Sequence, residues 1–266
     1  MWNIGGVELL SRLFLGSALY ESPAIMLKSL TASCAEVVTV SLRRQGPDLN
    51  AGKRFLDLIR AQNKKILPNT AGCHTAKEAI TTANMAREIF ATNWIKLEVI
   101  GDDYNLQPDP FELLTATKTL LSQGFEVFPY CTSDLVVAQR LVETGCKILM
   151  PWAAPIGSGM GPTDIYALQN LRARLPNTIL IVDAGLGKPS HAAEVMELGY
   201  DGVLLNSAVA LSENPPLMAE AFKCAVVAGR FGFEAGPMLP RTSASPSTPI
   251  VGTPFWQQSE VTQGLQ

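Results

Sequence analysis

Short apolar runs alternate along this chain with longer amphipathic stretches, and the two patterns predict different elements. The short runs are apolar or β-branched and have the length of buried strands, whereas the longer stretches are rich in Ala, Leu, Glu and Lys, as helices are. The predicted strands are residues 12–18, 36–42, 64–70, 94–100, 125–131, 147–153, 178–184 and 202–208. Predicted helices include residues 75–90, 133–145 and 190–199, and Gly145 and Gly199 stand where helices end.

Eight strands that alternate with helices indicate an α/β fold with a parallel sheet, because parallel strands need crossover connections. A (β/α)8 TIM barrel takes about 250 residues, and the chain has 266. We therefore predict a single-domain TIM barrel over residues 1–241. A doubly wound open sheet is the alternative, but no GxGxxG follows the first strand. Residues 242–266 are rich in Ser, Thr, Pro and Gly and predict a flexible tail.

Composition narrows the function classes. The chain is 47% hydrophobic and 17% charged, with 21 Lys and Arg against 24 Asp and Glu, which excludes a mainly disordered chain and a strongly basic one. We therefore expect no nucleic-acid or membrane partner, and no apolar run reaches the roughly 18 residues of a membrane helix. Five scattered cysteines without a CxxC pair, and charges at Glu8 and Arg12 that argue against a signal peptide, favour the cytoplasm.

The predicted strand 94–100 carries two charged residues on one face. Side chains alternate along a strand, so Lys96 and Glu98 lie opposite Ile95, Leu97 and Val99. The apolar face must pack under helices, which directs Lys96 and Glu98 into the barrel. A buried lysine is costly unless it is paired or neutral. Two interpretations stay open: a structural ion pair, or an amine that forms a Schiff base with a carbonyl substrate.

The last three predicted strands end in small or acidic residues, and barrel enzymes place their active sites at these strand ends. Asp183 is either a turn residue or a second acid/base group opposite Lys96. Small residues lie at or just after the ends of these strands, in the segments PIGSG (155–159), AGLG (184–187) and NSA (206–208). Glycine lets backbone N–H groups approach an anion closely, so these loops predict a phosphate site.

Other polar residues carry weaker signals. Cys73 and His74 could form a nucleophile pair, but adjacent residues at a helix start point apart. Arg43 and Arg44 fit a solvated or ion-paired loop better than a phosphate clamp. His74 and His191 are the only histidines and lie far apart in the sequence, so we expect neither a metal site nor a Ser-His-Asp triad.

Several of these segments together resemble thiazole synthase of thiamine biosynthesis. The resemblance extends from about residue 3 to about residue 240. The matching segments are VTVSLRR (38–44), PNTAGC (68–73), WIKLEVIGD (94–102), APIGSG (154–159), VDAG (182–185) and DGVLLNSA (201–208).

The resemblance implies a transferase with a TIM barrel and no cofactor, acting on 1-deoxy-D-xylulose 5-phosphate. It implies a thiocarboxylated sulfur-carrier protein as sulfur donor, a separate dehydroglycine-producing enzyme, a thiazole phosphate carboxylate as product, and a homo-oligomer, a tetramer. Lys96 matches the imine-forming lysine, and Glu98 and Asp183 match acid/base carboxylates. The positions that match the sugar-phosphate site are Gly157, Ala184, Gly185, Asn206 and Ser207.

The chain departs from the family pattern near the expected mouth of the barrel. Leu19 stands where the family has a lysine after the first strand, and Pro237 stands where it has an arginine. Both losses of positive charge bear on carrier docking and substrate affinity. The departing positions are Ser17, Ala18, Leu19, Trp152, Ala153 and Pro237. Two other functions remain: a lyase that uses the same lysine as class I aldolases do, and a sugar-phosphate-binding subunit without chemistry.

Overall fold

The chain divides into two units, Met1–Ala235 and Gly236–Gln266. The computed structural model describes residues 1–42, 55 and 57–245. Within the second unit, residues 236–245 form neither helix nor strand. Most of the expected flexible tail, residues 246–266, lies outside the described residues. The same holds for Arg43 and Arg44, so neither expectation is tested.

The first unit is a closed parallel barrel, which confirms the TIM-barrel prediction and excludes the open sheet. Each strand pairs in parallel with its two neighbours, and β12 pairs with β3 to close the ring. In the described part of the chain the barrel strands are β3 (Leu13–Gly16), β4 (Val37–Ser41), β5 (Lys65–Asn69), β6 (Trp94–Leu97), β9 (Glu126–Cys131), β10 (Ile148–Pro151), β11 (Ile179–Asp183) and β12 (Gly202–Leu205).

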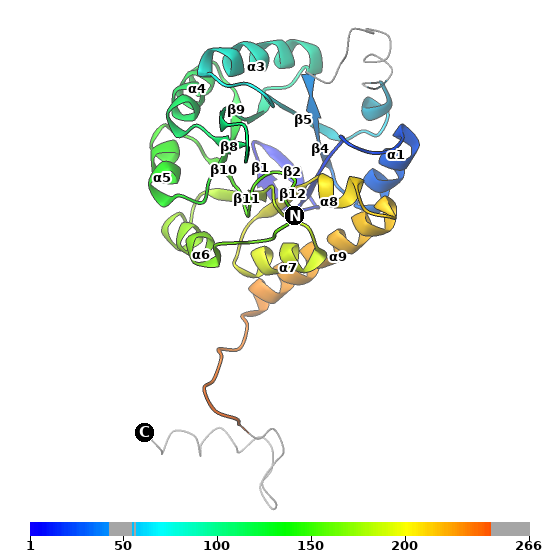
Figure 1. The fold of residues 1–266 in the computed structure, drawn as a ribbon, viewed down its shortest axis with the longest axis vertical. Coiled ribbons are helices and arrows are strands. Elements are labelled where there is room, and N and C mark those ends of the chain that lie inside the picture. The colour runs from blue at the N-terminus through cyan, green and yellow to red at the C-terminus, as the bar shows by residue number, and fades with distance from the viewer. Residues whose placement is uncertain (43–54, 56, 246–266) are drawn as a thin grey trace, which may run out of the picture. The chain divides into compact units, whose positions relative to one another are not determined.

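Helices surround the strands in a ring (Figure 1). Those that lie wholly within the described residues are α1 (Pro23–Ala32), α3 (Ala76–Phe90), α4 (Pro110–Ser122), α5 (Leu135–Glu143), α6 (Ile165–Arg174), α7 (Pro189–Glu197), α8 (Ser207–Ala210) and α9 (Pro215–Ala235). The predicted helices 75–90, 133–145 and 190–199 are α3, α5 and α7. Gly145 and Gly199 follow α5 and α7 with φ of +96° and +89°, the left-handed conformation that ends a helix.

Two apolar clusters hold the barrel together. One lies between the strands and the helices and includes Ile95, Leu97 and Val99, as predicted. The other fills the barrel interior and includes Trp94 and Phe128. Because Trp94 points inward and Ile95 outward, Lys96 also points inward.

A hairpin that the sequence analysis did not identify closes the barrel interior. It consists of β1 (Trp2–Ile4) and β2 (Val7–Leu9), which pair antiparallel and lie across the centre of the ring in Figure 1. Ile4 and Leu9 belong to the interior cluster, and Gly5 lies directly against the Trp94 ring. Since Trp94 begins β6, the hairpin covers the amino ends of the strands and leaves their carboxyl ends open.

The prediction of a single strand over residues 94–100 is wrong beyond Leu97. There β6 ends, and a short antiparallel ribbon of β7 (Ile100–Asp102) and β8 (Gln107–Pro108) follows. The Thr70 hydroxyl replaces a neighbouring strand at this point: it accepts a hydrogen bond from Glu98 N (2.8 Å) and donates one to Glu98 O (2.7 Å).

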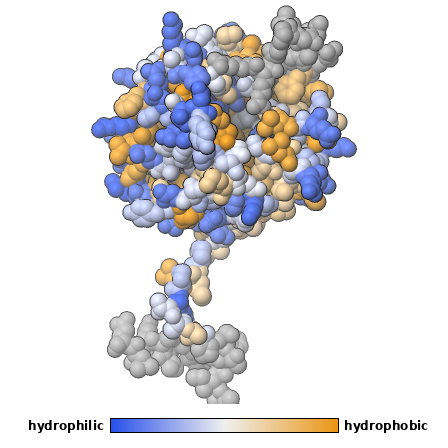
Figure 2. All heavy atoms as spheres, in the orientation of Figure 1, coloured by the Kyte–Doolittle hydropathy of each residue, from blue (hydrophilic) through white to orange (hydrophobic). Residues whose placement is uncertain are grey.

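The visible face of the barrel mixes polar and apolar side chains without a continuous apolar belt (Figure 2). No helix within the described residues has both the length and the apolar character needed to cross a membrane.

Candidate active site

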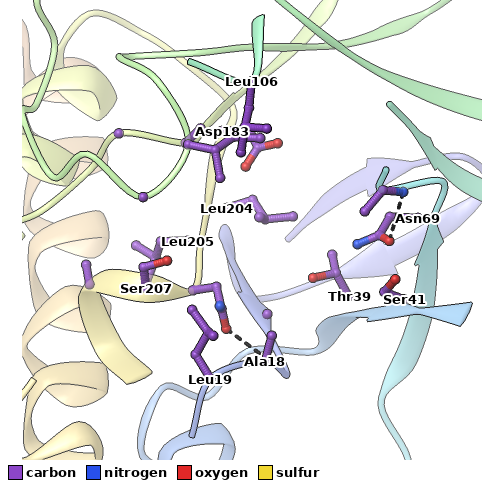
Figure 3. Close-up of a pocket in the computed structure, with 18 of the residues that line it drawn as sticks. Ala18, Leu19, Thr39, Ser41, Asn69, Leu106, Asp183, Leu204, Leu205 and Ser207 are labelled. Atoms are coloured by element: carbon purple, nitrogen blue, oxygen red, sulfur yellow. Dashed lines mark hydrogen bonds between the residues drawn. The ribbon is translucent and has the colours of Figure 1, made fainter. Parts of the chain in front are cut away.

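A pocket of about 660 Å³ opens at the carboxyl ends of the barrel strands. It is lined by residues that end their strands, among them Gly16, Ser41, Asn69 and Asp183. Figure 3 shows Asp183, Asn69 and Ser207 around this pocket, each from a different element. The pocket therefore lies where barrel enzymes bind their substrates.

Lys96, Glu98 and Asp183 meet in this pocket. The Lys96 Nζ atom lies 2.5 Å from Asp183 Oδ2 and 3.3 Å from Glu98 Oε1, and the three side chains are only 4–7% exposed. The structure thus brings the three predicted catalytic residues into contact. It also settles the orientation of Asp183, which lies on the inward face of β11 with Ile181.

The carboxylates control the protonation of the lysine. Burial lowers the pKa of Lys96, but the Asp183 and Glu98 carboxylates outweigh burial and raise its pKa above the ordinary value. The free protein therefore holds Lys96 as an ammonium between two carboxylates. An amine that attacks a carbonyl must first pass its proton to one of them.

Tyr130, on the inward face of β9, contributes an aromatic wall beside the lysine. Its ring centroid lies 5.7 Å from Lys96 Nζ, and Trp152 packs against it in a T-shaped arrangement with 6.4 Å between ring centroids. Burial, and then the Asp183 and Glu98 charges, raise the pKa of Tyr130, so the phenol is neutral. A role for Tyr130 was not predicted from the sequence, because apolar or aromatic residues occupy both faces of its strand.

The small-residue loops after β10, β11 and β12 converge at the pocket. All five positions predicted for the sugar phosphate line it: Gly157, Ala184, Gly185, Asn206 and Ser207. A Cβ on Gly157 would lie 3.9 Å from Ser207 Oγ, so the first and third loops are neighbours. Ala184 and Gly185 both adopt left-handed backbone, with φ of +66° and +76°. A Cβ on Gly185 would come within 2.5 Å of Ala154 N, so only glycine fits there.

Asn206, which follows β12, is anchored to the segment that follows the neighbouring strand β3. Its Oδ1 accepts a hydrogen bond from Ala18 N (3.2 Å), and its side chain packs so closely on Gly16 that any Cβ there would clash. The departing residues Ser17 and Leu19 also line the pocket, where the Ser17 hydroxyl donates to Thr39 O (2.7 Å). The replaced segment after β3 therefore belongs to the site.

Cys73 and His74 lie on different sides of their backbone, as the sequence analysis expected. Cys73 is buried and its Sγ lies 3.4 Å from Thr82 Oγ1. His74 lines the pocket rim, with Nε2 3.6 Å from Asp103 Oδ1. Lys188, which the sequence analysis overlooked, adds a cation to the pocket lining beside the loop after β11. Among the described residues no three His, Cys, Asp or Glu side chains gather as a metal site would require.

Comparison with known proteins agrees with this geometry. The family model for "Thiazole biosynthesis protein ThiG" matches residues 3–249. The chain belongs to this family. A thiazole synthase of Coxiella burnetii is 58% identical over 257 residues, which cover 96% of this chain and 98% of the relative. One from Rhodopseudomonas palustris is 61% identical over 246 residues, which cover 92% and 95%.

A solved structure has the same fold. A chain from the crystal structure of the Amycolatopsis orientalis BexX/CysO complex superposes with a TM-score of 0.81 at 31% sequence identity, covering 91% of this chain and 98% of that one. The family model and the two relatives confirm the resemblance to thiazole synthase seen in the sequence, and the solved structure supports the barrel fold.

Proposed function

We propose that this thiazole synthase family member forms an imine between Lys96 and the ketone of 1-deoxy-D-xylulose 5-phosphate and builds the thiazole phosphate from it. The observation that carries the proposal is the placement of one buried lysine between two carboxylates in a pocket with a small-residue rim. A structural ion pair needs one carboxylate; a second one, within reach of the same amine, suits repeated proton transfer.

The rim would bind the phosphate and the interior would receive the ketone. Backbone N–H groups of the loops around Gly157 and Gly185, the Ser207 hydroxyl and the Lys188 ammonium offer donors and positive charge to an anion. A phosphate held there leaves the carbon chain free to extend inward toward Lys96.

Asp183, the nearer carboxylate, would accept the proton from the Lys96 ammonium. The neutral amine then attacks the ketone carbon, and the proton on Asp183 leaves with the ketone oxygen as water, which gives the protonated imine. Glu98 would then take a proton from the adjacent carbon and return it to a neighbouring position. This moves the carbonyl along the sugar and opens a carbon for attack by sulfur.

The sulfur would come from the thiocarboxylated terminus of a small carrier protein, and carbon and nitrogen from dehydroglycine made by a separate enzyme. The BexX/CysO complex, which contains a chain of this fold with a second protein, supports a protein partner. We place the protein in the cytoplasm as a homo-oligomer, a tetramer, as the family resemblance implies.

Borohydride reduction tests the imine. The protein is incubated with the ketose phosphate, reduced, digested and analysed by peptide mass spectrometry, with Lys96→Ala and Lys96→Arg as controls. We expect an adduct on the Lys96 peptide that both controls lack. Absence of an adduct at saturating ketose phosphate contradicts the proposal and favours a binding subunit.

A second experiment on the same protein distinguishes a synthase from a lyase. Addition of thiocarboxylated carrier and dehydroglycine should convert the adduct-forming substrate into thiazole phosphate carboxylate. Cleavage of the ketose phosphate that ignores both donors would identify a lyase of the class I aldolase type.

A further inference from the structure

Two loops of the pocket rim are packed directly against each other. The loop after β11 approaches the loop after β10 so closely that a Cβ on Gly187 would clash with the Gly159 backbone. Gly161 N donates to Gly185 O at 2.8 Å, which ties the same two loops a second time. These glycine-rich segments have little stiffness of their own, so their arrangement depends on what holds the junction.

His191 lies at that junction, in the first turn of α7. Its Nδ1 accepts a hydrogen bond from Gly187 N at 3.2 Å. The opposite loop rests on its ring, since a Cβ on Gly161 would come within 2.8 Å of three imidazole atoms. One side chain from outside the pocket lining therefore contacts both loops.

The protonation state of His191 suits this contact. Burial, and then the positive charge of Lys188, lower the pKa of His191, while Glu194 acts in the opposite direction. A neutral imidazole keeps Nδ1 as an acceptor for the Gly187 N–H and carries its proton on Nε2.

We infer that His191 is a positioning residue that fixes the loops around Gly159 and Gly187 in the arrangement that receives the substrate's phosphate. This rests on the proposed function. A loop that is already fixed loses less conformational freedom when the ligand binds, so the contact supports affinity for the phosphate without touching it. The free ketose, which lacks the phosphate, gains nothing from this arrangement.

Calorimetry with two ligands tests the inference, using 1-deoxy-D-xylulose 5-phosphate and the same ketose without phosphate. His191→Leu replaces the imidazole by an apolar side chain without an acceptor. We expect it to bind the phosphorylated ketose about tenfold more weakly, because the loops must then be ordered when the ligand binds. Its Kd for the free ketose should stay within about twofold of the wild type. His191→Asn supplies an oxygen close to the Nδ1 position and should recover most of the affinity.

A helix-cap variant separates loop positioning from helix stability. In Asp134→Ala, α5 loses the bond from Val137 N to its N-cap carboxylate (2.9 Å), at a position outside the pocket lining. We expect it to lower the melting temperature about as much as His191→Leu does and to leave both Kd values unchanged.

The possible failures are distinguishable. If His191→Leu weakens both ligands equally, or weakens neither, the positioning role is wrong while the proposed function stands. If the wild-type protein itself does not prefer the phosphorylated ketose, the phosphate site of the proposed function is wrong and this inference is wrong with it.

Discussion

At the scale of single residues, the two carboxylates beside Lys96 act on it unequally. Asp183 lies at 2.5 Å and Glu98 at 3.3 Å from Nζ, and Asp183 makes the larger contribution to the raised pKa of Lys96. The shorter contact suits the proton acceptor for the amine. In the proposed mechanism, the longer contact suits Glu98 for proton transfer to and from the substrate.

Replacement of Asp183 should lower the pH at which the imine forms and should also slow its formation. In Asp183→Asn the larger pKa-raising interaction is lost while burial remains, so the pKa of Lys96 falls and the neutral amine is present at lower pH. We expect the midpoint of borohydride trapping against pH to move to lower pH. The maximal rate should fall about 100-fold or more because the amide accepts no proton. A midpoint that stays or rises would show that Asp183 does not govern Lys96.

Removal of the lysine should destabilise the protein by leaving carboxylates buried without their cation. We expect Lys96→Met to cost about 3–5 kcal/mol of unfolding free energy at neutral pH. The raised pKa keeps Lys96 charged there, and its contribution is lost only as the pH rises above the ordinary value of 10.5 toward the raised one. The double variant Lys96→Met/Asp183→Asn should recover part of the loss in urea unfolding. Additive losses would contradict the pairing.

The sequence allowed some of these residues to be placed and not others. Lys96 and Glu98 could be directed inward because the opposite face of their strand is uniformly apolar. Asp183 could not, since Ile179 and Ile181 on its own face are as apolar as the residues between them. A barrel interior is itself apolar, so hydrophobicity alone does not tell the two faces apart. Closure of the barrel decides the orientation.

At the scale of elements, the end of β6 is set by a side chain from another strand end. Thr70 follows β5 and bonds both backbone groups of Glu98 through one hydroxyl. The alternation of Glu98 with the apolar Val99 and Ile100 predicts a continued strand. The backbone of these residues is instead bonded to the Thr70 hydroxyl, Cys73 O and Asp109 N. Such side-chain bonds leave no trace in hydrophobic periodicity, which explains the overlong prediction.

Thr70→Val tests this arrangement because it keeps the shape and removes the hydroxyl. Two buried backbone groups of Glu98 lose their partner, so we expect a loss of about 1–3 kcal/mol in unfolding free energy and a lower yield of Lys96 adduct. Thr117→Val is the matched control. Thr117 is fully buried, and its hydroxyl has no hydrogen bond within the described structure, so its replacement should be neutral or stabilising. Equal losses in the two variants would contradict the role of Thr70.

At the scale of the whole barrel, the hairpin that packs on the interior core and the pocket lie at opposite ends. The hairpin β1–β2 covers the amino ends of the strands through Ile4 and Leu9, and the pocket opens at the carboxyl ends. The sequence predicted the eight strands and the end at which the site lies. It did not predict the hairpin, because strands of three residues carry too little pattern to identify.

Truncation of Ile4, the buried residue of β1, should therefore lower the stability of the protein without changing ligand binding. Ile4 is completely buried, and Ile4→Ala removes apolar contacts inside the barrel, which costs about 2–5 kcal/mol. We expect the melting temperature to fall while the Kd for the ketose phosphate stays unchanged. A weaker Kd would show that the two ends of the barrel are coupled.

The rim loops that we propose as the phosphate site follow three different strands, so a ligand bound there should stabilise the barrel as a whole. A ligand that binds only the folded protein adds about 2.7 kcal/mol at one hundred times its Kd. Loops after β10, β11 and β12 supply Gly157, Gly185 and Ser207. These residues come together only in the folded barrel, so the unfolded chain offers no such site. We therefore expect 1-deoxy-D-xylulose 5-phosphate to raise the melting temperature by several degrees. The unphosphorylated ketose at the same concentration should raise it far less, because it reaches Lys96 without contacts at the rim.

Differential scanning fluorimetry with Lys96→Arg, which forms no imine but keeps the cation, removes the covalent contribution from the comparison. Equal shifts for the two ketoses in that variant would show that the small-residue loops do not bind the phosphate.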